Sequence, residues 1–188
     1  MAVISMSDIK KNVRLIIGEV PYKVVEFQHV KPGKGAAFVR MKIKSFLNGK
    51  TVEKTVHAGD KFEIPVIDYK VMQYLYDDGD MYQFMDNETY DQLGLPYEQC
   101  DEASKWFKDG INVEIIFYKG KAISVAAPEF MELIVTDTPP NFKGDTSSGS
   151  KKPATLETGA VVQVPYHVLV DDLVKVNTIE CEFLGKVK

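Results

Sequence analysis

The sequence predicts an all-β protein built as three small β-barrels of about 60 residues each. First, short runs of alternating or β-branched residues recur along all 188 residues. Second, these runs are separated by Gly, Pro, Asn and Asp, the residues that favour turns. Third, only residues 87–109 have appreciable helical content. Units of this size bury little surface alone, so we expect the barrels to pack against one another.

Residues 1–64 form the first predicted domain, and hairpins dominate it. Strand-like runs cover 12–17 and 22–30, and residues 38–44 alternate apolar and basic side chains, as a half-buried strand does. The dipeptide Asn48-Gly49 is the strongest short hairpin signal in the chain, and the strand-like run 51–56 follows it. Three aromatic residues fall at strand spacing, and we interpret them as core rather than as a platform for stacking bases: Phe38, Phe46 and Phe62.

Two further domains are predicted, over residues 65–128 and 129–188. In the second domain we expect strands over 71–76, 81–85, 113–118 and 122–125, with helix inside 87–109. In the third we expect strands over 130–135, 160–164, 173–176 and 180–187, with a long polar stretch over 137–153.

Charge is distributed unevenly among these domains. Residues 1–64 contain 12 Lys and Arg against 6 Asp and Glu, a net charge of +6, whereas residues 65–128 have a net charge of −7 and residues 129–188 of −3. A basic segment can meet nucleic-acid phosphate. The acidic remainder would weaken indiscriminate binding to polyanions, so a protein that simply coats nucleic acid is not indicated.

The residues offer no assembled catalytic or metal site. The segments that resemble a phosphate-binding loop, a dinucleotide fingerprint and a calcium loop each lack required positions: Gly49–Thr51, Gly33–Phe38 and Asp77–Asp80. The three histidines are far apart in sequence. Cys100 and Cys181 have no disulfide or metal spacing, which favours reduced thiols in a cytoplasmic protein. No segment is apolar enough to span a membrane, and the start of the chain has no secretion signal layout.

The segment Lys31-Pro32-Gly33-Lys34-Gly35 is the most informative one. Pro32-Gly33 fits the centre of a type II turn, because Pro presets φ and Gly accepts a positive φ. This turn would place Lys34 at a tip from which a cation on a four-carbon stem can reach into a narrow crevice. The hairpin also carries Arg40 and Lys42, which are candidates for contacts with an RNA backbone. An ordinary solvent-exposed lysine is the alternative interpretation of Lys34.

Four segments carry a resemblance that covers nearly the whole chain in order. They are Phe27–Arg40 (FQHVKPGKGAAFVR), Tyr74–Asp80 with Phe84–Asp86, Gly144-Asp145-Thr146 and Lys152–Pro165. Together they resemble the bacterial elongation factor P family, and the first is similar to its lysine loop. The resemblance implies an SH3-like barrel followed by two OB-type barrels in an L-shaped, tRNA-like arrangement.

The same resemblance implies a function in translation. The protein would bind the 70S ribosome between the peptidyl and exit sites, contact ribosomal RNA, and relieve stalling at consecutive prolines without being an enzyme. Lys34 would point at the acceptor end of the peptidyl-tRNA and be extended by a lysine-modifying enzyme, and Lys31, Pro32, Gly33 and Gly35 would support it. Gly144 and Asp145 would approach messenger RNA in the exit site. We expect a monomer that needs no cofactor beyond this covalent modification.

The C-terminal strands depart from the family pattern, in which an Arg is followed by a Gly-acid-Tyr turn. Ile179, Cys181 and Phe183 occupy those positions, and we expect a strand with Cys there to pair normally. Two alternatives remain open at this point. One is a generic RNA-binding or RNA-chaperone protein of OB-like barrels, and the other is an enzyme with an unrecognised site. The residues do not indicate which chemical group Lys34 receives.

Overall fold

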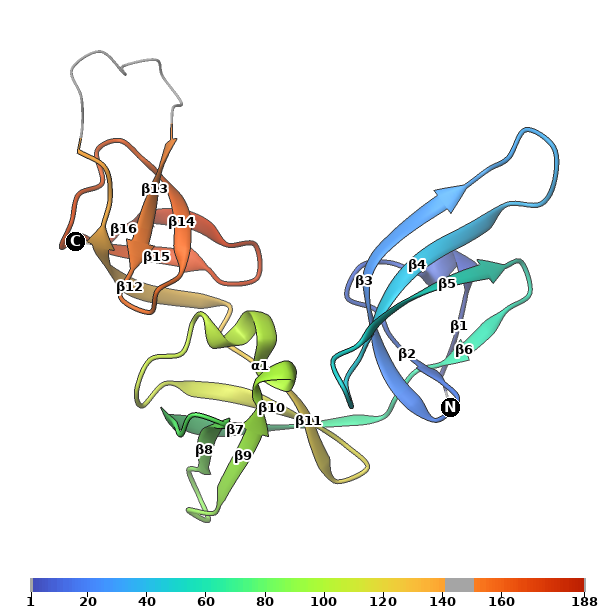
Figure 1. Cartoon of the computed structure of the whole chain (residues 1–188), viewed down its shortest axis with the longest axis horizontal. Helices are drawn as coiled ribbons and strands as arrows, with labels where there is room; N and C mark the ends of the chain where they lie inside the picture. Colours follow the sequence, from blue (N-terminus) through green and yellow to red (C-terminus); the bar gives the residue numbers. More distant parts are fainter. Residues whose placement is uncertain (1, 141–150, 188) are drawn as a thin grey trace. The chain divides into compact units, whose positions relative to one another are not determined.

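The computed structural model describes residues 2–140 and 151–187, and it is dominated by β-strands (Figure 1). The first sheet has the order β1-β6-β2-β3-β4-β5. Its elements are β1 (Val3–Ser5), the 3₁₀ turn η1 (Met6–Asp8), β2 (Arg14–Ile17), β3 (Val20–Val30), β4 (Phe38–Ser45), β5 (Thr51–His57) and β6 (Lys61–Glu63). The short strands β1 and β6 are additions to the elements that the sequence predicts.

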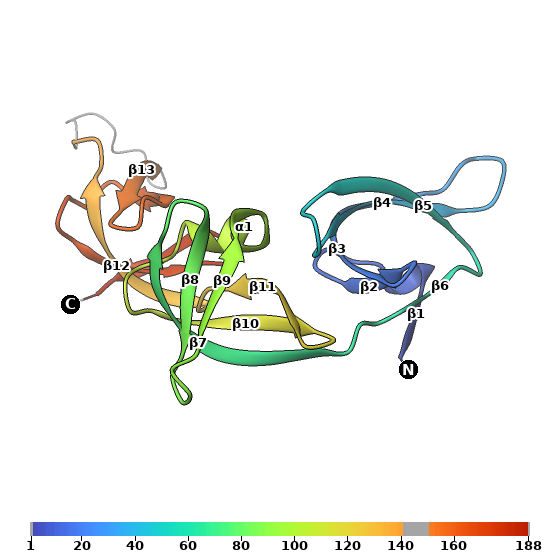
Figure 2. The same cartoon turned by 60° about the horizontal axis from the view of Figure 1, so that its bottom comes forward.

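Buried and outward-facing side chains alternate along β4, and the buried ones form part of the core of this sheet. Val39, Met41 and Ile43 are buried, while the residues between them point to the other face. Leu15 of β2 and Val24 of β3 complete the same apolar cluster. The loop between β3 and β4 projects from the end of this hairpin (Figure 2).

The second sheet has the order β11-β10-β7-β8-β9. Its elements are β7 (Ile67–Asp77), β8 (Met81–Asp86), β9 (Gln92–Pro96), α1 (Tyr97–Ser104), β10 (Asn112–Tyr118) and β11 (Lys121–Ala126). The prediction of helix inside 87–109 is confirmed by α1 at Tyr97–Ser104, but the helix does not extend over the rest of the range. Residues 92–96 pair with β8 instead, and α1 is interrupted at Asp101, whose φ is +26°. Tertiary pairing overrides the local helical preference here.

The third sheet is a closed barrel of five strands (Figure 1). It comprises β12 (Phe130–Asp137), β13 (Lys151–Leu156), β14 (Val161–Pro165), β15 (Leu173–Asn177) and β16 (Glu182–Lys186). Antiparallel pairs connect most neighbours, and the parallel pairing of Gln163 with Glu182 closes the barrel. Strand β13 begins inside the predicted polar stretch, because its alternate residues face the core. Together the three sheets confirm the prediction of a multi-domain all-β fold.

The chain divides into two compact units, residues 1–70 with 115–124 and residues 71–114 with 125–188. In the second unit, Trp106 is 2% exposed and belongs to the core of the C-terminal barrel. The domain limits 1–64, 65–128 and 129–188 stay a prediction. Among the described residues, no helix has the length and apolar character needed to cross a membrane.

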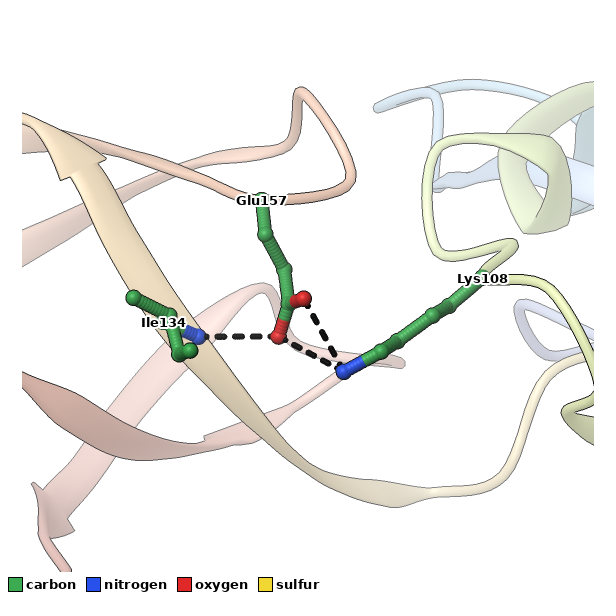
Figure 3. Close-up of polar contacts among 3 residues, drawn as sticks. All are labelled: Lys108, Ile134 and Glu157. Atoms are coloured by element: carbon green, nitrogen blue, oxygen red, sulfur yellow. Dashed lines mark hydrogen bonds and ion pairs between the residues drawn. The ribbon is translucent and has the colours of Figure 1, made fainter. Parts of the chain in front are cut away.

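A polar contact accompanies Trp106 in the second unit. The Lys108 ammonium lies 3.0 Å from Oε1 and 2.9 Å from Oε2 of Glu157, and the backbone N–H of Ile134 donates to Oε1 at 3.1 Å (Figure 3). Partial burial by itself raises the pKa of Glu157. The two hydrogen bonds and the charge of Lys108 outweigh that effect, so the pKa lies below its ordinary value. The loop after α1 is thereby held to the C-terminal barrel by both apolar and charged contacts.

Candidate nucleic-acid interface

The lysine loop occupies residues 31–37, between the end of β3 and the start of β4. Lys34 is exposed at its centre, and within the part of the chain that the structure describes its ammonium has no hydrogen bond or ion pair. Lys31, Pro32 and Gly33 are also exposed, as a projecting loop requires. A cation in this position is available for a partner.

The backbone of the loop differs from the sequence prediction at one point. A type II turn over Pro32-Gly33 requires a positive φ at Gly33, but the left-handed conformation occurs at Gly35, where φ is +116°. That prediction is therefore wrong. A Cβ on Gly35 would meet only Pro32, at an ordinary 3.8 Å, so glycine is required at residue 35 by the backbone and not by space.

Three strands present a polar outer face beside this loop. Their register forms rows across β3, β4 and β5, in which Glu26, Lys42 and Glu53 face one another. The next row toward the loop is Gln28, Arg40 and Thr55, and the last is Val30, Phe38 and His57. Directly opposite residues in neighbouring strands share one face of a sheet. The two predicted RNA-contact residues, Arg40 and Lys42, therefore lie on the same face.

The surroundings of Arg40 and Lys42 are different. The Lys42 ammonium donates to Glu26 Oε2 at 2.7 Å, and this bond, together with the charges of Glu26 and Glu53, raises the pKa of Lys42. Two carboxylates thus offset the charge of Lys42. The Arg40 guanidinium lies 5.6 Å from the centroid of the Phe38 ring, and it has no ion pair within the described ranges 2–140 and 151–187. Arg40 is the better placed of the two to meet a phosphate.

Sequence reasoning missed two residues of this face. Phe38 was expected in the core, but it is only partly buried and its ring centroid lies 6.0 Å from that of the exposed His57. That assignment is wrong for a reason visible in the sequence, because Phe38 shares its parity along β4 with Arg40 and Lys42. By contrast, Phe62 is buried as expected, and Phe46 is partly buried.

The predicted messenger RNA segment, Gly144 and Asp145, lies outside the described residues. Side chains join the residues that follow β12 to β13. Buried Lys152 donates to the carbonyl of Pro139 at 2.8 Å, and the Thr138 hydroxyl donates to the carbonyl of Pro153 at 2.9 Å.

The three divergent C-terminal residues lie before and within β16. Cys181 is in the turn before the strand and has a left-handed φ of +56°, so the expectation that it pairs as a strand residue is wrong. A side chain at such a φ is strained, which explains why glycine suits this position. Phe183 packs partly buried against the barrel core, and Ile179 is 66% exposed.

Other reactive groups do not assemble around a common point. Among the residues that the structure describes, no group of three His, Cys, Asp or Glu side chains could hold a metal ion. Burial raises the pKa of the Cys100 thiol to about 12, which leaves it protonated and unreactive.

Comparisons with known proteins identify the family. Three family models match in order: the elongation factor P KOW-like domain over residues 5–62, its OB domain over 67–125, and the elongation factor P C-terminal domain over 131–186. Elongation factor P of Sulfurimonas denitrificans is 79% identical over the full length of both chains. That of Wolinella succinogenes is 62% identical over 98% of each.

A solved structure of initiation factor 5A from Methanococcus jannaschii is 31% identical and covers 66% of this chain and 95% of its own, with a TM-score of 0.47. That score is low, so the assignment rests on the family models and the sequence relatives, which bear the name of a translation factor. The sequence prediction of the family is confirmed: the chain belongs to the bacterial elongation factor P family of translation factors.

Proposed function

We propose that this translation factor binds the ribosome between the peptidyl and exit sites and stimulates peptide-bond formation on ribosomes stalled at consecutive prolines. The loop centred on Lys34 positions the acceptor end of the peptidyl-tRNA. The observation that supports this proposal best is the exposed ammonium of Lys34, which has no partner among the described residues and lies on a loop that projects from the β3–β4 hairpin. Family membership supports a role with the ribosome.

The proposed mechanism is positional. Proline has a ring-locked φ, so its reacting groups are easily held in unproductive geometry. When the acceptor end is already held in a productive pose, the loss of orientation entropy does not add to the barrier of the reaction. A reduction of about 1.4 kcal/mol in the barrier raises the rate tenfold. The ribosome performs the chemistry, and this chain contributes a cation and a scaffold rather than acting as an enzyme.

The partners follow from this role. They are ribosomal RNA, peptidyl-tRNA, a lysine-modifying enzyme acting on Lys34, and messenger RNA in the exit site at Gly144 and Asp145. Lys31, Pro32, Gly33 and Gly35 support the loop. We infer a cytoplasmic monomer, since ribosomes are its site of action. The L-shaped arrangement that the resemblance implies stays a prediction.

A reconstituted translation assay tests the proposal with protein purified from its own source. The readout is the full-length yield from a reporter with a proline run, compared with a reporter without one. Wild type should raise only the proline-run yield, and Lys34→Ala should not. Lys50→Ala is the matched control, because Lys50 is an exposed lysine in the β4–β5 turn of the same sheet.

The contradicting outcomes are distinct. A folded wild type that affects neither reporter refutes the proposed role. Equal stimulation by wild type and Lys34→Ala refutes the mechanism through Lys34. Tight binding to free RNA without an effect on translation would favour a generic RNA-binding protein.

A further inference from the structure

We infer that Phe38, Arg40 and His57 form a stacking site for a nucleobase near the acceptor end of the peptidyl-tRNA, an inference that rests on the proposed function. The three side chains lie in adjacent rows on the outer face of β4 and β5. The phenyl ring of Phe38 contacts the imidazole of His57 on one side, with centroids 6.0 Å apart. The Arg40 guanidinium lies 5.6 Å from the same ring. We call these three residues the stacking platform.

The chemistry of the stacking platform fits single-stranded RNA. Unpaired bases stack on aromatic rings and on guanidinium planes, and the platform has both kinds of surface. His57 is exposed and Phe38 partly buried, so one ring is anchored and the other is accessible. Arg40 adds a charge for the neighbouring phosphate, which an apolar protein ligand would not use.

Charge complementarity favours a polyanion such as RNA over a basic protein partner. Residues 1–64 have a net charge of +6. Glu26 and Glu53 lie in the row of Lys42, and the Asp60 carboxylate accepts the backbone N–H of His57 at 2.9 Å. The row of Arg40, which lies between the row of Lys42 and the row of Phe38 and His57, otherwise contains the neutral residues Gln28 and Thr55. The stacking platform therefore presents one cation and two rings to a partner, and its own two rows contain no carboxylate.

The position of the stacking platform also fits the lysine loop. Phe38 pairs with Val30, the last residue before the loop, so the platform is at the base from which Lys34 projects. Lys34 is the fourth residue after Val30, a reach of at most about 14 Å. Stacked nucleotides advance about 3.4 Å each. If the end of an RNA strand meets Lys34, a base a few nucleotides from that end can therefore reach the stacking platform.

The test is a titration of single-turnover peptide-bond formation on ribosomes that carry a proline-ended peptidyl-tRNA. Phe38→Leu and His57→Leu should each raise the half-saturating protein concentration about tenfold, because one stacked base is lost, and should leave the maximal rate near that of wild type. Lys34→Ala should lower the maximal rate. Phe38→Tyr and His57→Tyr keep the rings and should behave like wild type.

A second measurement reports on stacking directly. 2-Aminopurine in the single-stranded acceptor end changes its fluorescence when it stacks, so wild type should change the signal and the two leucine variants should not. Tyr76→Leu is the matched control, since Tyr76 is a 51% exposed aromatic residue of β7. Thermal unfolding of every variant checks that the fold is kept, and His57→Leu serves if Phe38→Leu does not fold.

The outcomes separate the two proposals. If the leucine variants equal wild type in half-saturation and fluorescence while Lys34→Ala is defective, the stacking platform is refuted and the proposed function stands. If wild type itself changes neither peptide-bond formation nor the fluorescence, both the stacking platform and the proposed function are refuted. If Phe38→Tyr and His57→Tyr raise the half-saturating concentration as much as the leucine variants do, stacking is also refuted.

Discussion

Two lysine–glutamate pairs of nearly equal length, Lys42–Glu26 at 2.7 Å and Lys108–Glu157 at 2.9 Å, have opposite surroundings. Both partners of the first pair are at least half exposed, on the outer face of β3 and β4. In the second pair the Glu157 side chain is only 23% exposed, and it also accepts the Ile134 N–H. Solvent screens the first pair, whereas a backbone donor and partial burial support the second. The distance between the charged atoms therefore does not by itself distinguish a surface contact from a structural one.

The same contrast extends to the aromatic residues beside each pair. Phe38 lies on the outer face with an accessible neighbour, His57, whereas Trp106 is buried in the core of the C-terminal barrel. The first region is available for a partner, and the second holds together one compact unit.

Trp106→Ala should cause the largest loss of stability. Truncation of a buried tryptophan lowers the free energy of unfolding by about 3–5 kcal/mol, since it removes apolar contacts and leaves a cavity. Urea unfolding followed by circular dichroism measures it, because the variant lacks the chain's single tryptophan. Tyr90→Ala, at a residue 71% exposed, should change the value by no more than about 0.5 kcal/mol. Similar effects of both substitutions would show that Trp106 does not anchor the barrel.

Arg40→Ala and Lys42→Ala should separate the two basic residues of the outer face. Arg40→Ala should weaken ribosome binding about tenfold. It should also reduce, by about one, the slope of the logarithm of the binding constant against the logarithm of the salt concentration. Lys42→Ala should change binding less than about twofold, since Glu26 and Glu53 already offset the Lys42 charge. Binding over a range of salt concentrations checks both values. A stronger effect from Lys42→Ala would mean that the partner displaces Glu26.

Glu157→Gln should lower the free energy of unfolding by about 1 kcal/mol, because the charge-assisted bonds to Lys108 and Ile134 weaken. Glu26→Gln is the matched variant in the exposed pair, and its urea midpoint should equal that of wild type. Equal destabilisation by both would contradict the difference between the two pairs.

The stabilisation by Glu157 should depend on pH with a defined sign. Its pKa is lowered in the folded state, so the contribution is fully present above the ordinary value of 4.5 and is lost as pH falls through the lower, folded-state pKa. The stability difference between wild type and Glu157→Gln should therefore be constant near neutral pH and shrink below 4.5. Urea unfolding from about pH 7 to about pH 3 measures it. A difference that persists unchanged to the lowest pH would contradict the pKa direction.

Much of the fold was predictable because its signals are local. The alternation of residues 38–44 corresponds to β4, and Asn48-Gly49 lies in the β4–β5 turn with a positive φ at Gly49. Within 87–109 the helix was predictable at α1, but the strand Gln92–Pro96 was not, because its pairing with β8 joins segments that local preference does not connect. The role of Lys34 was predictable only through the resemblance, and it stays a prediction.

The all-β class and the exposed lysine loop follow from the sequence alone, since periodicity and turn residues act over a few positions, and the family follows from the resemblance of whole segments. The three-dimensional packing was needed to show that Lys42 is flanked by two carboxylates, that Phe38 lies beside His57, and that Trp106 lies in the core of the C-terminal barrel. These facts depend on strand register and on packing between distant segments. Register and packing minimise the free energy of the whole chain, so no short window of residues can specify them.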